Sequence, residues 1–472
     1  MQRDAIDLGS GDVSRLFRGL FFPTLLGMTG ISLVTVADGM FIGHGVGSDG
    51  IAAVNIACVP VMLIAGVGLM MGAGCSVVSA IHLGRGNVKA ARLNLTQALA
   101  AGSLIALLVC LAVWIFPEPV LRALGCSDTL MPLCKDYILW YSLSWMFEVW
   151  TCIALFMVRL DGSPRYAMGC SLTAAVFNVV LDYLFIIVFS WGVKGAAIAT
   201  AIATIAGGSM AIIYPLFIAK TMKVTRIKLS RKSLRLSLRN VGYQCSIGLS
   251  GLLTELTIAV LMFMGNWVFM TYLQEDGVGA FGIACYYTPF FYMIGNSIAQ
   301  SAQPIISYNF GQGKWKRVRD ARRTSLVAAL ICGLACTLLF LFCPRLLVWL
   351  FIDLKTNAAA IAMEGFPWFS AAFIPFVVNL SIIGYYQSVE RPRPATALAL
   401  LRGVVLLVPS FLLLPLILPG KGMWLALAAS ELLTTLIAIV PVLLRHKAFR
   451  CIRFPHCPRL RSPSTQEKNS EP

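Results

Sequence analysis

Four polar residues interrupt long apolar stretches of this chain, and their side chains are suited to binding an ion. Asp38 lies in GMTGISLVTVADGMFIG, Asn178 and Asp182 lie in LTAAVFNVVLDYLFIIVF, and Thr200 lies in GAAIATAIATIAG. An ionisable group inside a membrane helix is costly, and it normally faces a protein interior or a water-filled cavity. Carboxylate, amide and hydroxyl oxygens are the ligands that hard cations prefer, and a carboxylate can also carry a proton. These residues therefore predict a site for Na⁺ or H⁺.

The spacing of these residues favours a single shared site. Asn178 and Asp182 are four residues apart, so a helix puts them on the same face. Counted from the predicted ends of their helices, all four residues lie in the outer half of a bilayer. Two carboxylates in one site repel each other, which makes a proton as well as Na⁺ a suitable occupant. Structural hydrogen bonds are the alternative interpretation of the same residues.

The elements that must position these residues are membrane-spanning helices. Hydrophobic residues make up 58% of the 472 residues and charged residues only 12%, whereas soluble proteins carry about 25% charged residues. A helix needs roughly 20 apolar residues to cross a bilayer. Twelve spans are predicted near residues 16–42, 52–81, 94–116, 134–158, 166–189, 193–219, 241–270, 279–308, 324–343, 360–387, 395–417 and 422–444. The predicted fold class is an all-α polytopic membrane protein.

The basic residues are concentrated on one predicted side of the membrane. The chain contains 38 Lys and Arg and has a net charge of +17, a value that could also indicate nucleic-acid binding. If the N-terminus is cytoplasmic, however, few basic residues fall outside: Arg122, Lys135, Lys194, Arg345, Lys355 and Lys421. The positive-inside rule then predicts that both termini are cytoplasmic. The expected partner of this charge is the lipid bilayer, and no nucleic acid is expected.

An internal repeat divides the chain into two halves. Several glycines and prolines recur 227 residues apart: Gly84 and Gly311, Gly86 and Gly313, and Pro117 and Pro344. The recurrence of these residues at one spacing predicts two six-helix bundles that arose by duplication. The bundles are expected to be related by an axis along the membrane normal. The predicted domains are an N-terminal segment (1–15), a first bundle (16–219), a basic linker (220–240), a second bundle (241–445) and a basic tail (446–472). The linker could lie on the inner surface as an amphipathic helix.

These features together resemble one transporter family. The stretch PTLLGMTGISLVTVADGMFIG, the G-x-G-N-x-x-x-A turn after the second span, the N-x-x-x-D of the fifth span and the six-plus-six repeat resemble the multidrug and toxic compound extrusion (MATE) family. The resemblance is greatest to its bacterial MepA/DinF-like branch and covers about residues 10–445. It implies a V-shaped pair of bundles around a central cavity in a bacterial inner membrane. It also implies that the residues matching Asp38, Asn178, Asp182 and Thr200 form the cation site of the first half.

The same resemblance implies a function. Members of the family export cationic drugs in exchange for Na⁺ or H⁺ that enters the cell, so cationic small molecules and one of these ions are the expected partners. No cofactor is expected, and a monomer is expected.

Further residues are candidates for contact with the substrate or with a second cation: Glu148, Glu255, Tyr137 and Met28. Glu255 lies at about the position where the NorM-type branch of the family has its coupling carboxylate. That branch also has an acid in the tenth span, and the tenth predicted span here, WFSAAFIPFVVNLSIIGYYQ, has none. This difference from the NorM-type pattern argues against a complete second ion site.

Two other features of the spans carry predictions. Pro23 lies inside the first span, where proline kinks a helix, so it is a candidate hinge, with a static bend as the alternative. Arg402 and Glu431 lie at similar depths in the last two spans. They predict a buried ion pair.

A flippase for lipid-linked glycans is the alternative function. It needs buried basic residues for a pyrophosphate, whereas the predicted spans contain one base, Arg402, and five acids: Asp38, Glu148, Asp182, Glu255 and Glu431. An enzyme is not expected, because the chain has no Walker A motif, no H-E-x-x-H motif and no Ser-His-Asp grouping.

Overall fold

The computed structural model describes residues 7–124, 126–226 and 230–448. Within these ranges the chain consists of helices and short connections. Ten helices are long and apolar enough to cross a membrane, and two bent helix pairs bring the number of spans to twelve. The predicted all-α membrane architecture is therefore confirmed. Most of the predicted N-terminal segment is described, but residues 449–472 of the predicted tail lie outside the described residues.

The first half of the molecule runs from the N-terminal segment to the end of η2. Its helices are α1 (Val13–Gly45), α2 (Ser48–Gly84), α3 (Val88–Ile115), α4 (Pro117–Ala123), α5 (Met131–Ser142), α6 (Trp145–Leu160), α7 (Pro164–Asp182), η1 (Tyr183–Val188), α8 (Gly192–Ile213) and η2 (Tyr214–Ile218). The segments labelled η are π-helical. Polar side chains cap two of the helices: Asp12 accepts from Arg15 N at 2.8 Å, and Asn87 accepts from Ala90 N at 3.1 Å.

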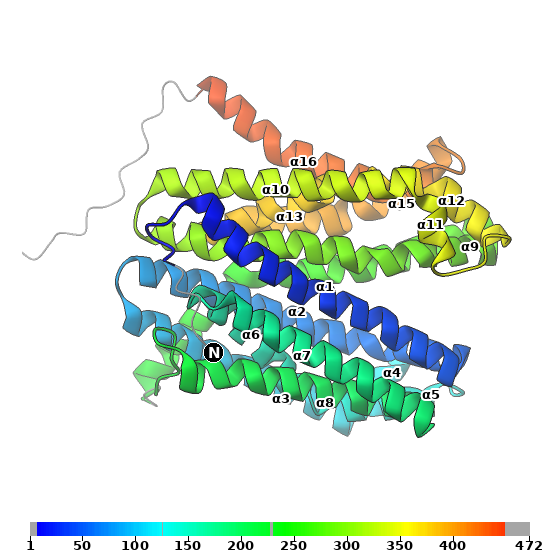
Figure 1. Ribbon diagram of the computed structural model, residues 1–472, viewed down its shortest axis with the longest axis horizontal. Helices are drawn as coiled ribbons and strands as arrows, with labels where there is room; N and C mark the ends of the chain where they lie inside the picture. The colour runs from blue at the N-terminus through cyan, green and yellow to red at the C-terminus, as the bar shows by residue number, and fades with distance from the viewer. Residues whose placement is uncertain (1–6, 125, 227–229, 449–472) are drawn as a thin grey trace, which may run out of the picture.

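The second half begins with two long helices that share the label α9 and meet at Gln274. Its elements are α9 (Arg231–Gly311), α10 (Trp315–Phe342), α11 (Pro344–Trp349), α12 (Asn357–Ser370), α13 (Phe373–Ser388), α14 (Pro392–Leu400), η3 (Leu401–Val405), α15 (Leu407–Ile417) and α16 (Gly422–Ala448). In Figure 1 the two halves lie against each other with their long helices running in similar directions. Contacts between the halves run mainly from α1 and α2 to α9.

The repeat seen in the sequence is also present in the helix boundaries. Helices α3 and α10 are both 28 residues long and begin 227 residues apart, at Val88 and Trp315. The short helices α4 and α11 begin at Pro117 and Pro344, where proline is favoured because the first helical N–H has no partner to lose. The predicted relation between the halves is confirmed at this level.

Two predicted spans are broken rather than continuous. The span predicted at 134–158 consists of α5 and α6, which are bent by 49°, and the span predicted at 360–387 consists of α12 and α13, which are bent by 46°. At both breaks a serine hydroxyl donates to the backbone of the preceding turn. Ser144 Oγ bonds to Tyr141 O at 2.8 Å, and Ser370 Oγ bonds to Pro367 O at 2.7 Å. Such bonds compete with the helical ladder and bend it.

The seventh and eighth predicted spans are two helices, Arg231–Gln274 and Asp276–Gly311, which together carry the label α9. They meet at a kink at Gln274, whose φ is 55°. A non-glycine residue with positive φ is uncommon and carries a conformational cost.

The predicted linker, 220–240, has two described parts. Residues 219–226 are non-helical, and residues 231–240 are helical and form the beginning of α9. The position of this helical part on the inner membrane surface stays a prediction. The linker lies across the turn between α6 and α7: Asp161 Oδ1 accepts from Thr221 N and Met222 N, both at 3.2 Å. Arg92 Nε also donates to Thr221 O at 2.8 Å. These bonds fasten the linker to the first half and bury the α6–α7 turn.

The two halves also meet closely where α2 and α9 end. This region lies near Arg85, Lys89, Lys314 and Arg317, and we call it the basic end. A Cβ on Gly84 would collide with the carbonyl oxygen of Tyr308, and a Cβ on Gly311 would collide with that of Ile81. These two contacts are related by the repeat. Only glycine allows backbones to come this close, so the small residues at both positions permit the halves to close together at the basic end.

Candidate ion and substrate site

The structure brings the four predicted ion-site residues together between α1, α7 and α8. The carboxyl groups of Asp38 on α1 and Asp182 at the end of α7 interact electrostatically with each other. One turn before Asp182, Asn178 Nδ2 donates to Thr200 Oγ1 at 3.2 Å, and Thr200 Oγ1 donates to Ala196 O at 2.9 Å. Asp182 is fully buried, and Asp38 is half-buried.

The chemistry of this cluster is dominated by acceptors. Within the described chain, four buried oxygens have no hydrogen-bond donor: Asp38 Oδ1, both carboxyl oxygens of Asp182, and Asn178 Oδ1. Buried polar atoms in proteins are almost always satisfied, and a group of unsatisfied acceptors is costly. A bound cation would coordinate these oxygens, and a bound proton would provide the missing hydrogen-bond donor. The donor set therefore fits Na⁺ or H⁺, which would be cargo of the protein.

The helix type changes from α to π at this cluster. Helix α7 ends at Asp182 and continues as the π-helical segment η1, a geometry that is rare and frequent at functional sites. The α1 end packs directly against this segment, because a Cβ on Gly45 would collide with the side chain of Ile186. The apolar sequence YLFIIV offers no signal for a π-helix, so sequence reasoning missed it.

Tyr137 and Met28 lie in different places. The hydroxyl of Tyr137 on α5 interacts with the thiol of Cys58 on α2, and both groups lie within electrostatic range of Asp38. Tyr137 thus adjoins the ion cluster. Met28 on α1 lies at the boundary between the halves, where its Sδ accepts from Ser297 Oγ on α9 at 3.3 Å. Pro23 lies inside α1, which is helical from Val13 to Gly45, and its role as a hinge stays a prediction.

Glu148 and Glu255 approach each other from opposite halves. Glu148 lies on α6, Glu255 lies on α9, and their carboxyl groups are within electrostatic range. Tyr292 on α9 donates its hydroxyl to Glu255 Oε1 at 2.7 Å. The two acids therefore form a second acidic region, located between the halves rather than inside one of them.

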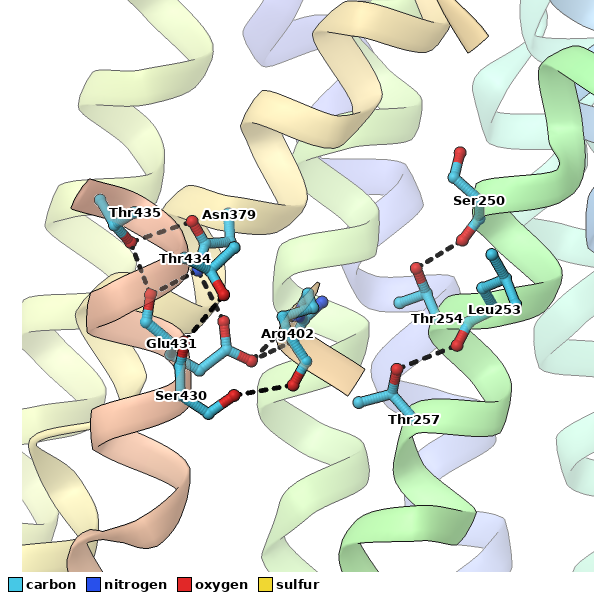
Figure 2. Close-up of polar contacts among 10 residues, drawn as sticks. All are labelled: Ser250, Leu253, Thr254, Thr257, Asn379, Arg402, Ser430, Glu431, Thr434 and Thr435. Carbon is cyan, nitrogen blue, oxygen red and sulfur yellow. Dashed lines mark hydrogen bonds and ion pairs between the residues drawn. The ribbon is translucent and has the colours of Figure 1, made fainter. Parts of the chain in front are cut away.

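Arg402 and Glu431 form the buried ion pair that the sequence predicts. Arg402 donates to Glu431 Oε1 from Nε at 2.9 Å and from Nη2 at 2.6 Å, and neither side chain is exposed. Figure 2 shows how the network continues: Asn379 Nδ2 donates to Glu431 Oε2 at 2.7 Å, and Ser430 Oγ donates to Arg402 O at 2.8 Å. Arg402 lies in the π-helical segment η3 and stacks over the ring of Phe376 at 4.3 Å.

One buried base was missed. Arg159 lies just beyond the fourth predicted span, so counting charges assigned it to a cytoplasmic loop. In the structure it occupies the last turn of α6 and is only 5% exposed. The reason is tertiary, because the linker covers the neighbouring turn through Asp161. The expectation of a single buried base is therefore wrong.

Comparison with known proteins agrees with this architecture. The MatE family model matches residues 23–184 and again residues 252–412, once in each half. Among curated proteins the chain is similar to the FAD transporter of Shewanella oneidensis, with 24% identity over 440 residues, covering 91% of this chain and 94% of that protein. It is also similar to the multidrug export protein MepA of Staphylococcus aureus, with 24% identity over 447 residues, covering 92% and 95%.

Solved structures show the same fold. A MOP superfamily transporter from Pyrococcus furiosus, described as having a binding pocket of reverse polarity, superposes with a TM-score of 0.84 at 19% identity, covering 94% of this chain and 98% of that one. An outward-facing multidrug resistance MATE family transporter gives a TM-score of 0.84 at 20% identity, covering 93% and 97%. The match of the family model to both halves identifies the chain as a member of the MatE family, the multidrug and toxic compound extrusion transporters, and hence as a multi-pass membrane transporter rather than an enzyme.

Proposed function

We propose that this protein is a secondary active multidrug antiporter that exports cationic amphipathic compounds in exchange for Na⁺ or H⁺. The observation that carries the proposal is the cluster of buried, donor-free oxygens formed by Asp38, Asn178 and Asp182. Such a cluster requires a positive partner. The similarity to the multidrug export protein MepA supports drugs as the exported class.

The proposed setting is the cytoplasmic membrane of a bacterium, with both termini in the cytoplasm and the protein acting as a monomer. The basic end would then face the cytoplasm, as the positive-inside rule requires. Because the halves meet closely there at Gly84 and Gly311, the described conformation is closed toward the cytoplasm. The acidic pair Glu148 and Glu255, which lies between the halves, is suited to the cationic group of a drug.

Coupling follows from differential binding. The two halves rock to expose the region between them to each side in turn, and the ion drives export only if it binds the two states with different affinity. Entry of Na⁺ or H⁺ at Asp38 and Asp182 neutralises their repulsion and draws α1 toward α7. A bend of α1 near Pro23 would then narrow the first half of the cavity and expel the drug outward.

An exporter of an anionic metabolite is the second candidate, and a lipid-linked glycan flippase belongs to the same class. The similarity to an FAD transporter and the buried Arg159 favour this candidate. The acidic pair Glu148 and Glu255 between the halves favours the cation exporter, because acidic groups repel an anionic cargo.

Transport in reconstituted vesicles tests the proposal. Purified protein is placed in liposomes, a Na⁺ gradient or a proton gradient is imposed separately, and uptake of a fluorescent cation such as ethidium is followed. We expect one of the two gradients to drive ethidium against its concentration difference. Transport that responds to neither gradient would contradict the antiport proposal.

A further inference from the structure

Two cysteine thiols lie in contact at the end of the first half that is opposite the basic end. Cys126 lies in the connection between α4 and α5, and Cys134 lies near the start of α5. Their Sγ atoms are 3.3 Å apart. Cys134 has no exposed surface, and Cys126 is 7% exposed. The fold therefore holds two buried thiols against each other, eight residues apart in the chain.

The position of both sulfurs is fixed by contacts with neighbouring helices. The backbone N–H of Cys126 donates to Leu121 O on α4 at 3.0 Å. The thiol of Cys134 donates to Ala53 O on α2 at 3.5 Å. A thiol is a weak donor, so oxidation of Cys134 would remove little from this second contact. The backbone around the pair is thus held in place by bonds that do not depend on the thiol hydrogens.

The related turn of the second half is held together differently. It joins α11 to α12, and the residue 227 positions after Cys126 is Asp353. There the hydroxyl of Thr356 donates to Asp353 O at 2.9 Å and accepts a backbone N–H of the first turn at 3.2 Å, which caps α12. Helix α5 has no side-chain cap. Thr129, which matches Thr356 in the repeat, bonds to Ser127 Oγ at 2.9 Å instead.

The location of the pair in the cell determines its chemical state. Helix α3 begins beside the basic end at Val88 and ends at Ile115, so α4 and the start of α5 lie at the opposite end of the molecule (Figure 1). With the basic end in the cytoplasm, as proposed above, Cys126 and Cys134 lie outside it. Disulfides form and persist in such oxidising surroundings, whereas cytoplasmic thiols are kept reduced.

We infer that Cys126 and Cys134 form a disulfide in the protein in its membrane, and that this bond takes the place of the missing cap at the start of α5. The inference rests on the proposed orientation and goes beyond the proposed transport function. A disulfide bond is about 2.05 Å long, so the sulfurs must approach by about 1.3 Å from their separation of 3.3 Å. Rotation of the two side chains is sufficient for a movement of this size.

The bond forms by thiol–disulfide exchange with a disulfide oxidant of the extracytoplasmic space. The thiolate of Cys126, the more exposed of the two, attacks one sulfur of the oxidant and releases the other as a thiol. The thiolate of Cys134 then attacks the Cys126 sulfur of this mixed disulfide and releases the second thiol. The two cysteines together lose two protons and two electrons, and the oxidant's disulfide gains them as two thiols.

The disulfide restrains a part of the molecule that adjoins the proposed ion site. It closes the turn between α4 and α5 covalently, which lowers the entropy of that turn in any opened state. Tyr137 lies three residues after Cys134 on the same helix, and it adjoins the ion cluster through Cys58 and Asp38. The bond therefore holds the end of the helix that positions Tyr137.

The oxidation state can be read from a single peptide. Trypsin cleaves after Arg122 and Lys135, so both cysteines lie on the peptide 123–135. Cells that express the full-length protein are quenched with acid, and free thiols are blocked with N-ethylmaleimide in denaturing detergent. Disulfides are then reduced and alkylated with iodoacetamide, and the peptide is analysed by mass spectrometry. Cys126→Ser, which leaves Cys134 without a partner, is the matched control.

The two samples should give opposite labels. More than about four-fifths of the wild-type peptide should carry two iodoacetamide labels, because structural disulfides resist reduction by cellular thiols. In Cys126→Ser, Cys134 should carry N-ethylmaleimide instead. Purified wild-type protein that is reduced and then treated with glutathione disulfide should form the internal bond again, rather than carry glutathione on both cysteines.

Two outcomes would overturn the inference. A wild-type peptide from cells that carries two N-ethylmaleimide groups would show that the pair is not oxidised in the membrane. Glutathione on both cysteines of the purified protein would show that the two sulfurs do not reach each other. The orientation is judged separately, by labelling a cysteine placed at Ser190 from outside cells. Free thiols at Cys126 and Cys134 together with such labelling would contradict the disulfide and leave the proposed orientation intact.

Discussion

At the scale of single residues, the buried charged side chains have three kinds of environment. Asp38 and Asp182 face each other with unsatisfied oxygens. Arg402 forms an ion pair with Glu431, and Arg159 has only a neutral partner. An ion-paired charge contributes to structure, whereas a cluster of like charges without donors marks a position where an ion completes the site.

Removing either carboxyl charge of the ion cluster should abolish transport. In Asp38→Asn and Asp182→Asn the amide cannot take up and release a cation, so drug efflux should stop although the protein still reaches the membrane. Asn178→Ala and Thr200→Ala should each reduce efflux only in part. Efflux from cells is measured against Asp136→Asn, which neutralises an exposed acid on α5; full activity of Asp38→Asn or Asp182→Asn would assign that residue a structural role.

The Arg402–Glu431 pair should contribute to stability. Arg402→Met leaves the Glu431 charge buried and unpaired, which should cost about 3–5 kcal/mol. The double variant Arg402→Met/Glu431→Met removes both charges and should be more stable than Arg402→Met alone. Thermal unfolding in detergent gives the comparison, and a double variant less stable than Arg402→Met would argue against an isolated structural pair.

At the scale of elements, regular α-helical geometry is interrupted near buried polar and charged residues of the spans. The π-helical segments η1 and η3 lie at Asp182 and Arg402, and the breaks between α5 and α6 and between α12 and α13 occupy related positions in the two halves. Interruptions of this kind release backbone groups that must be satisfied by the surrounding protein. The segment η3 lies within its span, Pro392–Ile417, whereas η1 forms the last turn of its span, Pro164–Val188.

The close contact of α2 with α9 should control closure of the basic end. Gly84→Val introduces a side chain that collides with the backbone at Tyr308, so the state closed at that end should become less populated. The buried Cys75 on α2 should then react faster with a maleimide. Gly242→Ala, at a position with open space on α9, is the control; unchanged Cys75 reactivity in Gly84→Val would mean that this contact does not limit opening.

At the scale of the whole molecule, the distribution of charge predicts the orientation in the membrane. A cysteine placed at Ser190 should be labelled by an impermeant reagent added outside cells, and a cysteine placed at Lys220 should not. Both positions are exposed, and native cysteines are first replaced. Labelling of the Lys220 position from outside would contradict the assigned orientation. The basic end would then face the outside of the cell.

Ion and drug should bind antagonistically if the two halves couple them as proposed. Raising Na⁺ or lowering pH should weaken drug affinity by about fivefold or more, a common size for coupling between sites. The drug should weaken ion affinity by the same factor, because coupling free energies are reciprocal. Titrations of ethidium at several Na⁺ concentrations and pH values measure this; affinity that is insensitive to both would exclude competition through the ion cluster.

The sequence by itself determined the membrane class, the repeat and the candidate ion residues. Long apolar runs, glycines and prolines repeated 227 residues apart, and Asp38, Asn178 and Asp182 within apolar stretches are all local patterns. The cost of burying polar groups in a bilayer makes such patterns reliable. The buried pairing of Arg402 with Glu431 could also be predicted, because each charge needs a partner at the same depth.

Only the tertiary structure decided which residues of different helices lie together. The hydrogen bond from Arg159 on α6 to Gln300 on α9 depends on how these two helices pack, and no local pattern encodes that packing. The burial of Arg159 likewise requires the linker to fold back over the α6–α7 turn through Asp161. Contacts between residues distant in the chain arise from packing and hydrogen bonding across helices, whereas the sequence pattern reports only the environment of each helix separately.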